Sequence, residues 1–405
     1  MTKTEQINSE VKLFGNVQFI YELVLAKMEL ESFDIEYSVN ESLRSFDIAK
    51  LPNQENFLSR TAYFENLNNI PSLYKKITSR NITRSINQYL THWFYPYKGK
   101  FHPQMIRALF NYLQIQSGET ILDPFIGSGT TALEAQLLGI NCIGIDVSEV
   151  CYLISKVKTN STNSHSEIKN TFNYLEELLD GKHTGENEQL QSVSNFVQNI
   201  KNENCKNFYW VAELITHSDR ARRRKKNPIQ LFYNNSKKML ESVSDYVELI
   251  NKFNLNLGET SFYIQDAREL KLQSNSVDGI ITSPPYSIAL DYVENDKHSF
   301  SVLGKKTDEI RENFIGVRGK GNSKIEMYNS DMVKAYEEMD RVLKPGRKCV
   351  IVIGNATLNK QEIKTVEMTI EIFTKMGYSL EKNLDKIIFG LYNIMQKENI
   401  LIFAK

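Results

Sequence analysis

A short apolar strand that runs through a glycine-rich turn into a helix constrains the fold of this chain more than any other feature. Residues 120–123 have the pattern of the strand, Gly127 and Gly129 lie in the turn, and residues 132–139 have an apolar helical pattern that ends on a glycine. A second strand, residues 141–145, follows at once. This order is the first half of a βαβ unit, so we expect a doubly wound α/β sheet.

The second strand ends at Asp146, about 19 residues after Gly127. An acidic residue near this spacing accepts hydrogen bonds from the ribose hydroxyls of an adenosine ligand. Thr130 and Thr131 replace the residues that precede the third glycine of the dinucleotide fingerprint, which disfavours a pyrophosphate ligand. The turn therefore predicts a site for an adenosine-containing molecule.

Two adjacent prolines mark a second candidate site. The run Ser283-Pro284-Pro285-Tyr286 ends the apolar segment 277–281, and because each proline fixes φ and lacks an N–H, the chain turns a rigid corner there. The backbone carbonyls and the serine hydroxyl of such a corner can accept hydrogen bonds from the amino group of a nucleobase, on which the tyrosine ring can stack. A surface turn beside a buried tyrosine is the structural alternative.

The order of these motifs along the chain supports a shared ligand site. Residues 262–266 form a further strand pattern that ends in an acid, Asp266, just before the strand that carries the proline corner. Ligands of open α/β sheets bind at the carboxyl ends of the strands. We therefore expect the glycine turn, Asp146, Asp266 and Ser283 to meet in one crevice.

The stretches DPFIGSGTT, GID, QDA and TSPPY, in this order, resemble the motifs of the DNA amino-methyltransferases that use S-adenosyl-L-methionine (AdoMet). The resemblance covers about residues 91–155 and 260–405. It implies a mostly parallel, seven-stranded Rossmann-like sheet with a C-terminal antiparallel strand. It also implies that AdoMet is the cofactor and that double-stranded DNA is the partner. The reaction it implies is methyl transfer to the exocyclic amino group of a flipped base.

The same resemblance assigns roles to individual residues. Asp146 would hold the ribose, and Asp266 would accept from the adenine amino group. The cofactor-binding residues it implies are Phe101, Asp123, Phe125, Gly127, Gly129, Thr130, Asp146 and Asp266, and the catalytic residues are Ser283, Pro284, Pro285 and Tyr286. A different interpretation of Phe101 is that it merely leads into the amphipathic helix at 104–113.

Serine at position 283 favours cytosine N4 as the target, because family members that act on adenine N6 commonly carry aspartate before the prolines. Many members with a Ser-Pro-Pro-Tyr corner place it before the glycine motif, whereas it follows that motif in this chain by about 155 residues. Adenine N6 in DNA, or a base of RNA or tRNA, stays open as an alternative target. The resemblance also leads us to expect a restriction-modification system with a separately encoded endonuclease.

Composition limits the class of protein. The 405 residues include 49 Lys+Arg and 49 Asp+Glu, so net charge does not indicate a polyanion as partner. The four cysteines form no CxxC pair, which argues against a zinc cluster or a disulfide framework, and none lies in a Pro-Cys corner as cytosine C5 methylation would need. We expect no metal and no membrane span, and the cytoplasm as location. The oligomeric state stays open.

The chain divides into four segments. We expect a mostly helical N-terminal region at 1–90, an AdoMet-binding half at 91–158, a helical insertion for target recognition and DNA contact at 159–259, and a catalytic half at 260–405. Clustered cations suggest phosphate contacts, with a solvated helix face as the alternative. The DNA-contacting residues predicted from these clusters are Arg220, Arg222, Arg223, Arg224, Lys225, Lys226, Arg318 and Lys320.

Overall fold

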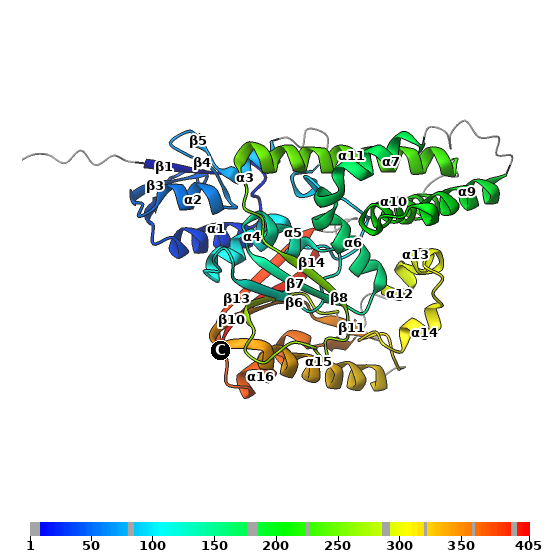
Figure 1. Cartoon of the computed structure of the whole chain (residues 1–405). Helices are drawn as coiled ribbons and strands as arrows, with labels where there is room; N and C mark the ends of the chain where they lie inside the picture. The colour runs from blue at the N-terminus through cyan, green and yellow to red at the C-terminus, as the bar shows by residue number, and fades with distance from the viewer. Residues whose placement is uncertain are drawn as a thin grey trace, which may run out of the picture.

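The fold is a mixed α/β arrangement of a central sheet, an N-terminal sheet and a helical insertion (Figure 1). The computed structural model describes most of the chain, namely residues 9–79, 85–175, 185–222, 227–285, 292–319, 322–358, 361–389 and 395–405. No helix of this described part is long and apolar enough to cross a membrane.

The central sheet has seven strands in the order β13-β14-β10-β9-β6-β7-β8. Strand β14 is antiparallel to both of its neighbours, whereas β10, β9, β6, β7 and β8 run parallel to one another. The fold class predicted from the sequence is thereby confirmed. The strands are β6 (Thr120–Asp123), β7 (Asn141–Asp146), β8 (Thr260–Ile264), β9 (Val277–Thr282), β10 (Leu343–Ile353), β13 (Ser379–Phe389) and β14 (Met395–Ala404).

Helices cover both faces of this sheet because successive strand residues point to opposite sides. Ile281 and Val350 pack in the core that contains α4 and α5, while their neighbours Ile280 and Ile351 pack in the core that contains α15 and α16. The covering helices are α4 (Pro103–Tyr112), α5 (Thr130–Leu137), α6 (Glu149–Asn160), α15 (Asn322–Val342) and α16 (Thr365–Lys375). The short elements are η1 (Ile86–Gln88), α12 (Tyr292–Asn295), α13 (Lys297–Val302), α14 (Thr307–Arg311), β11 (Ala356–Leu358) and β12 (Gln361–Ile363).

The expectation of a mostly helical N-terminal region needs correction, because this region contains a five-stranded antiparallel sheet in the order β2-β3-β1-β4-β5. Its strands are short, and the extra residue that β4 carries opposite Lys12 and Leu13 breaks the two-residue periodicity of that strand. The elements are β1 (Ser9–Leu13), α1 (Ile20–Ser32), β2 (Glu36–Val39), β3 (Ser45–Lys50), α2 (Gln54–Arg60), β4 (Phe64–Leu67), β5 (Ile70–Pro71) and α3 (Leu73–Thr78).

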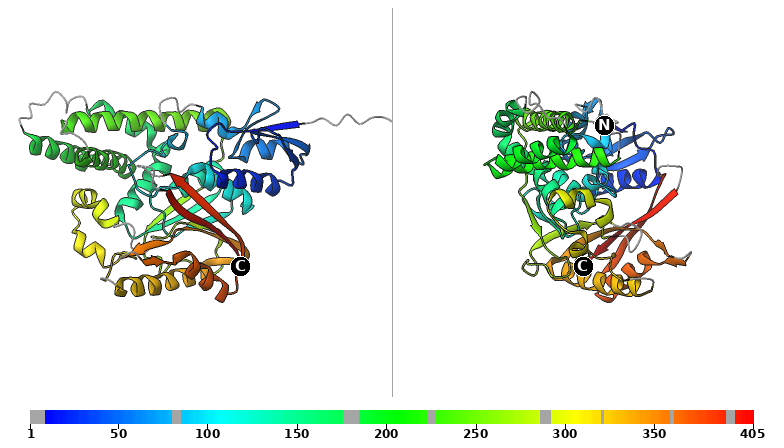
Figure 2. Two further views of the ribbon diagram at one scale, coloured as in Figure 1. Left: turned by 180° about the vertical axis from the view of Figure 1, so that it is seen from behind. Right: turned by 90° about the vertical axis from the view of Figure 1, so that its right-hand side faces the viewer.

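The insertion between β7 and β8 is helical, as the sequence predicted. Its elements are η2 (Ser161–Ser164), α7 (His165–Asn173), α9 (Glu186–Asn199), α10 (Glu203–Arg222) and α11 (Pro228–Phe253). Their core includes Val197, Phe208 and Phe232, and it continues into α6 and into the segment after the proline corner. Figures 1 and 2 show the insertion and the N-terminal sheet on the side of the central sheet opposite to α15 and α16.

Candidate active site

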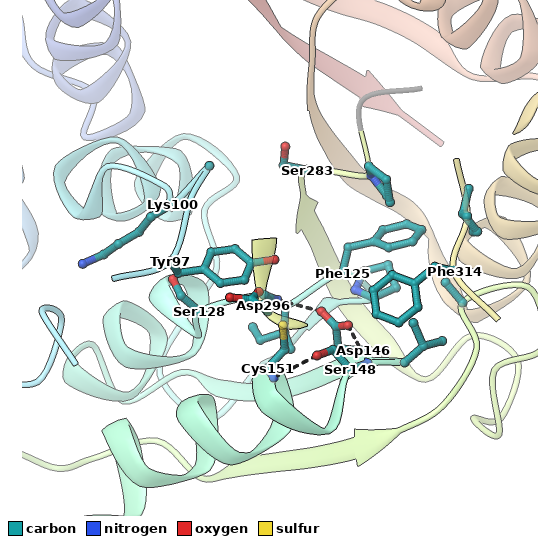
Figure 3. A pocket seen from close by; sticks show the side chains of 18 of the residues that line it. Tyr97, Lys100, Phe125, Ser128, Asp146, Ser148, Cys151, Ser283, Asp296 and Phe314 are labelled. Atoms are coloured by element: carbon teal, nitrogen blue, oxygen red, sulfur yellow. Dashed lines mark hydrogen bonds between the residues drawn. The ribbon is translucent and has the colours of Figure 1, made fainter. Parts of the chain in front are cut away.

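A pocket opens where the segments that follow β6, β7, β8 and β9 come together (Figure 3). Its lining contains both halves of the predicted site, although the glycine turn and the proline corner lie far apart in the sequence. The predicted residues that line it are Phe101, Phe125, Gly127, Thr130, Asp146, Asp266, Ser283 and Pro285. The structure thus brings together the two motifs that sequence analysis expected to share one crevice.

The glycine turn needs both of its glycines for two separate reasons. Gly127 and Gly129 adopt φ values of +49° and +75°, in the left-handed region that side chains rarely adopt. A Cβ atom at Gly127 would come within 3.1 Å of the Tyr97 ring, and one at Gly129 within 2.9 Å of the Ser155 Cα atom. The turn therefore lies close to its neighbours, and only Gly127 of the pair lines the pocket.

Asp146 ends β7 at the edge of the pocket, partly buried. Its carboxylate accepts hydrogen bonds from the backbone N–H groups of Gly127, at 3.0 Å, and Ser148, at 2.9 Å. Burial raises the pKa of Asp146 to about 6, although these two hydrogen bonds partly offset the effect. The carboxylate joins the glycine turn to the strand end that the ribose is expected to meet.

Asp123 lies beneath the pocket and does not line it. Its carboxylate accepts from the hydroxyls of Thr131, at 2.7 Å, and Thr282, at 2.6 Å, and from the Phe125 N–H, at 3.2 Å. Burial raises its pKa to about 6. Asp123, which the resemblance implies as a cofactor-binding residue, therefore uses its carboxylate to link β6, α5 and β9.

Asp266 lines the pocket just after β8, and its carboxylate is already paired with Arg268. The Nε atom of Arg268 donates to both carboxylate oxygens, at 2.9 and 3.0 Å, and the Arg268 backbone N–H donates to one of them, at 2.9 Å. These hydrogen bonds and the positive charge hold the pKa of Asp266 below its usual range, against the effect of burial. Asp266 therefore presents an ionised acceptor to the pocket.

The proline corner forms another part of the pocket wall. Ser283 and Pro285 line the pocket, and Pro284 is buried. The hydroxyl of Tyr328, on α15, donates to the Pro285 carbonyl at 2.9 Å, which fixes the corner to the helix layer beneath it. Tyr286, the predicted stacking platform, lies outside the described residues.

Comparison with known proteins agrees with this geometry. Residues 94–317, more than half of the chain, match the family model described as RMKL-like, methyltransferase domain. The chain belongs to this methyltransferase family. Within this methyltransferase domain lie the glycine turn, both acidic strand ends and the proline corner.

Three curated relatives are similar to this methyltransferase over different lengths. Type II methyltransferase M.BsoBI of Geobacillus stearothermophilus is 24% identical over 336 residues, covering 68% of this chain and 64% of the relative. Type II methyltransferase M.MvaI of Kocuria varians is 23% identical over an alignment of 405 residues, covering 76% and 87%. The tRNA (guanine(10)-N2)-dimethyltransferase of Methanothermobacter thermautotrophicus is 38% identical over 55 residues, covering 14% and 16%. The chain thus spans less than two thirds of the length of M.BsoBI.

The pocket of this methyltransferase fits AdoMet. Thr130 lines it at the first turn of α5, and its hydroxyl is buried with no hydrogen-bond partner within the described part of the chain. A ligand carboxylate would satisfy that hydroxyl, and the N-terminus of a helix favours a negative charge. Phe101 and Phe125 form an apolar part of the pocket wall. AdoMet is the cofactor of this domain.

The predicted DNA contacts are described only in part. Arg220 is 14% exposed and pairs with Glu186, and Arg318 is 23% exposed and pairs with the buried Asp331, so each has an acidic partner within the protein and its contact with DNA stays a prediction. The side chain of Arg222, and Arg223, Arg224, Lys225, Lys226 and Lys320, lie outside the described residues.

Sequence analysis missed two groups of site residues. Lys158 is fully buried behind the glycine turn, where its ammonium donates to the Ser128 carbonyl at 2.6 Å, and burial brings its pKa well below the usual range. Asp296, Phe300 and Phe314 line the pocket from the segment after the proline corner. No motif marks these residues, since their place depends on contacts with distant segments. The described residues include no cluster of three or more His, Cys, Asp or Glu that could hold a metal ion.

Proposed function

We propose that this chain is a site-specific DNA methyltransferase that methylates the exocyclic amino group of a flipped base, with cytosine N4 as the favoured target. The observation that carries the proposal is the shared pocket, in which Ser283 and Pro285 face the cavity that Gly127 and Asp146 also line. A methyl donor and an amine acceptor have to meet in one cavity for the transfer to occur. The relatives named Type II methyltransferases support DNA as the substrate.

AdoMet supplies an electrophilic methyl group on a sulfonium when it is bound. The exocyclic amine of a base is a weak nucleophile because its lone pair is delocalised into the ring, and positive charge grows on the nitrogen as it attacks. The Ser283 hydroxyl and the Pro284 carbonyl act as hydrogen-bond acceptors for the amine N–H groups, so they stabilise that charge. Tyr328 keeps the corner rigid through its hydrogen bond to Pro285.

The preference for cytosine N4 rests on the serine of the Ser-Pro-Pro-Tyr corner, and adenine N6 is the alternative. Transfer of labelled methyl groups from AdoMet into duplex DNA, followed by nucleoside analysis, distinguishes the two. We expect N4-methylcytosine. Label in N6-methyladenine alone would overturn the choice of base, and no label in either would overturn DNA amino-methylation.

The role of Ser283 is tested by Ser283→Ala. We expect the variant to bind AdoMet with unchanged affinity and to lose most methyl transfer, by about 10²-fold if the hydroxyl acts on developing charge. Ser276→Ala is the matched control, since Ser276 directly precedes the same strand at its other end, where its hydroxyl donates to the Gln273 carbonyl. Full turnover in Ser283→Ala would remove the serine from the mechanism.

A tRNA base is the second candidate substrate, because one relative is named a tRNA (guanine(10)-N2)-dimethyltransferase. The same labelling assay, run with unmodified tRNA beside duplex DNA, separates the candidates. We expect incorporation into DNA to dominate. Preferential labelling of tRNA would replace the proposed substrate while leaving the methyltransferase assignment intact.

We extend the proposal to a restriction-modification system with a separately encoded endonuclease, which the Type II relatives support. Long-read sequencing of DNA from a methylation-free host that expresses this chain would report the modified base, its position and its sequence context together. We expect one short recognition sequence to be modified throughout the genome. Methylation scattered without a common sequence would contradict a Type II role.

A further inference from the structure

Asp296 is a pocket residue that no motif accounts for. It lies just before α13, is 6% exposed and lines the pocket. An aspartate at this N-cap position ordinarily accepts from the first backbone N–H groups of the helix, but Asp296 makes no such side-chain cap. Its carboxylate instead accepts from the Tyr95 hydroxyl at 2.6 Å. The Asp296 carboxylate is thus held by a residue from a distant segment of the chain.

The hydrogen bond from the Tyr95 hydroxyl orients the Asp296 carboxylate. Burial, and then the charge of Asp296, raise the pKa of Tyr95, so the phenol stays protonated and donates. Tyr95 also lies within 2.7 Å of the Ser299 hydroxyl, which fixes its ring from a second side. An ionised carboxylate in a buried position is stabilised by a cation that it contacts.

Asp296 faces the same part of the pocket as Asp146 and Cys151. Its negative charge contributes to the raised pKa values of both groups, after the larger effect of burial. Figure 3 shows the Asp296 side chain between Tyr97 and Asp146, both of which lie against the glycine turn. Tyr97 touches that turn, since its ring would lie 3.1 Å from a Cβ atom at Gly127. The carboxylate therefore stands where the methionine end of AdoMet would pass.

The other carboxylates around the glycine turn have different partners. Asp123 is beneath the pocket and receives three hydrogen bonds from the protein. Asp266 is paired with Arg268, and Asp146 receives two backbone N–H groups at the end of β7. The methionine end of AdoMet is a zwitterion, so it needs an acceptor for its ammonium group as well as donors for its carboxylate.

We infer that Asp296 binds the α-ammonium group of AdoMet, with Tyr95 as the residue that positions it. The methionine carboxylate then belongs at the other side of the turn, where the unpartnered hydroxyl of Thr130 and the N-terminus of α5 provide donors. This inference rests on the cofactor assigned above and is independent of which base is methylated.

Binding of two ligands that differ only at the amino-acid end tests the assignment by calorimetry. S-adenosylhomocysteine carries the ammonium and carboxylate groups, and 5′-methylthioadenosine keeps the adenosine and sulfur but lacks both. We expect Asp296→Asn to weaken S-adenosylhomocysteine by roughly 10- to 100-fold, the loss typical of a hydrogen bond to a charged group, and to change methylthioadenosine by less than about threefold. Equal weakening of both ligands, or none of either, would overturn the inference.

Asp146→Asn is the matched control, because its carboxylate faces the ribose that both ligands share. We expect it to weaken both ligands alike. Tyr95→Phe keeps the carboxylate and removes the orienting hydroxyl, so it should weaken S-adenosylhomocysteine by a smaller factor than Asp296→Asn and leave methylthioadenosine unchanged. If Tyr95→Phe weakened the binding of both ligands, Tyr95 would instead act by maintaining the shape of the pocket.

A measurement on the unaltered protein keeps the inference testable should Asp296→Asn fail to fold. An S-adenosylhomocysteine analogue without its amino group should bind about tenfold or more weakly than the parent, and equal affinity would overturn an ammonium site. Absence of binding by every adenosyl ligand would instead overturn the cofactor itself. Failure of DNA methylation with intact ligand selectivity would count only against the proposed substrate.

Discussion

Thr282 donates its hydroxyl to the Asp123 carboxylate at 2.6 Å, across 159 positions of sequence. Asp123 ends the strand before the glycine turn, and Thr282 is the residue directly before the serine of the proline corner. The two motifs that line the pocket are therefore connected beneath it by a buried hydrogen bond. This hydrogen bond explains how the proline corner is held at a fixed position relative to the glycine turn, although the two motifs come from different halves of the domain.

Thr282→Val tests that link. The variant keeps the shape of the side chain but leaves the Asp123 carboxylate one donor short, which we expect to reduce the free energy of unfolding by about 1–3 kcal/mol. Methyl transfer should fall as well, because the corner loses its tie to the turn. Thr131→Val removes the other hydroxyl from the same carboxylate. In urea unfolding both variants should lose similar stability, but turnover should fall further in Thr282→Val, and equal turnover would contradict the link.

Gly127→Ala should damage cofactor binding more than it damages stability. The new Cβ would meet the Tyr97 ring at 3.1 Å on a backbone with φ +49°, so the pocket wall must move. Gly118→Ala is the matched control, since Gly118 has φ +86° with nothing within 4 Å of the added atom. Both variants should lose about 1–2 kcal/mol of stability from left-handed backbone. Calorimetry with S-adenosylhomocysteine should show weaker binding only in Gly127→Ala. Unchanged binding in that variant would show that the glycine turn does not contact the cofactor.

Tyr328→Phe should slow methyl transfer and leave cofactor affinity unchanged. The lost hydroxyl donates to the Pro285 carbonyl at 2.9 Å, so the corner becomes less rigid while the cofactor side of the pocket keeps its contacts. Tyr336→Phe removes a hydroxyl from the same helix, where its partner at 3.1 Å is Thr369 on α16, and neither residue lines the pocket. We expect turnover to fall several-fold only in Tyr328→Phe. A parallel loss in both variants would point to the stability of α15 instead of the corner.

Sequence patterns predicted the parts of this molecule that depend on near neighbours. The strand, turn and helix around Gly127 and the acid at the end of β7 are local features, and hydrophobic periodicity shows them directly. Their meeting with Ser283 followed from a rule of topology, because parallel strands place their carboxyl ends at one edge. The N-terminal sheet was not predicted, because β1 pairs with β3 and β4, which are distant in the sequence. The first of these partners begins 36 positions after the start of β1.

Roles that depend on distant partners could not be read from sequence. Whether Asp123 faces the pocket is decided in part by Thr282, and whether Arg220 is free is decided by Glu186 on another helix. Asp296 takes its orientation from Tyr95, which precedes it by 201 positions. In each case the residue type was visible in the sequence, but the hydrogen-bond partner that fixes its direction was not.

The affinity for adenosyl ligands should fall below pH 6 through Asp146. Its pKa of about 6 is raised chiefly by burial, and ribose hydroxyls donate best to the ionised carboxylate, so binding requires the deprotonated form. Affinity is therefore full above pH 6 and should fall by up to about tenfold per unit as the pH drops below it. The thiol of Cys151, whose pKa burial raises well above its usual range, stays neutral throughout and adds no pH dependence.

Calorimetry between pH 7.5 and 5 measures this effect, with 5′-methylthioadenosine as ligand because it has no carboxylate or amine of its own to titrate. Asp146→Asn should bind more weakly at pH 7.5 and lose most of the pH dependence, since an amide cannot take up the proton. Any dependence that remains would come from Asp123 beneath the pocket, whose pKa burial also raises to about 6. Asp296→Asn keeps the Asp146 carboxylate but removes a neighbouring negative charge, so its affinity should begin to fall at a lower pH than in the unaltered protein. Affinity that rises toward pH 5 would show that the protonated form of Asp146 binds the ribose and would reverse the sign argued for this carboxylate.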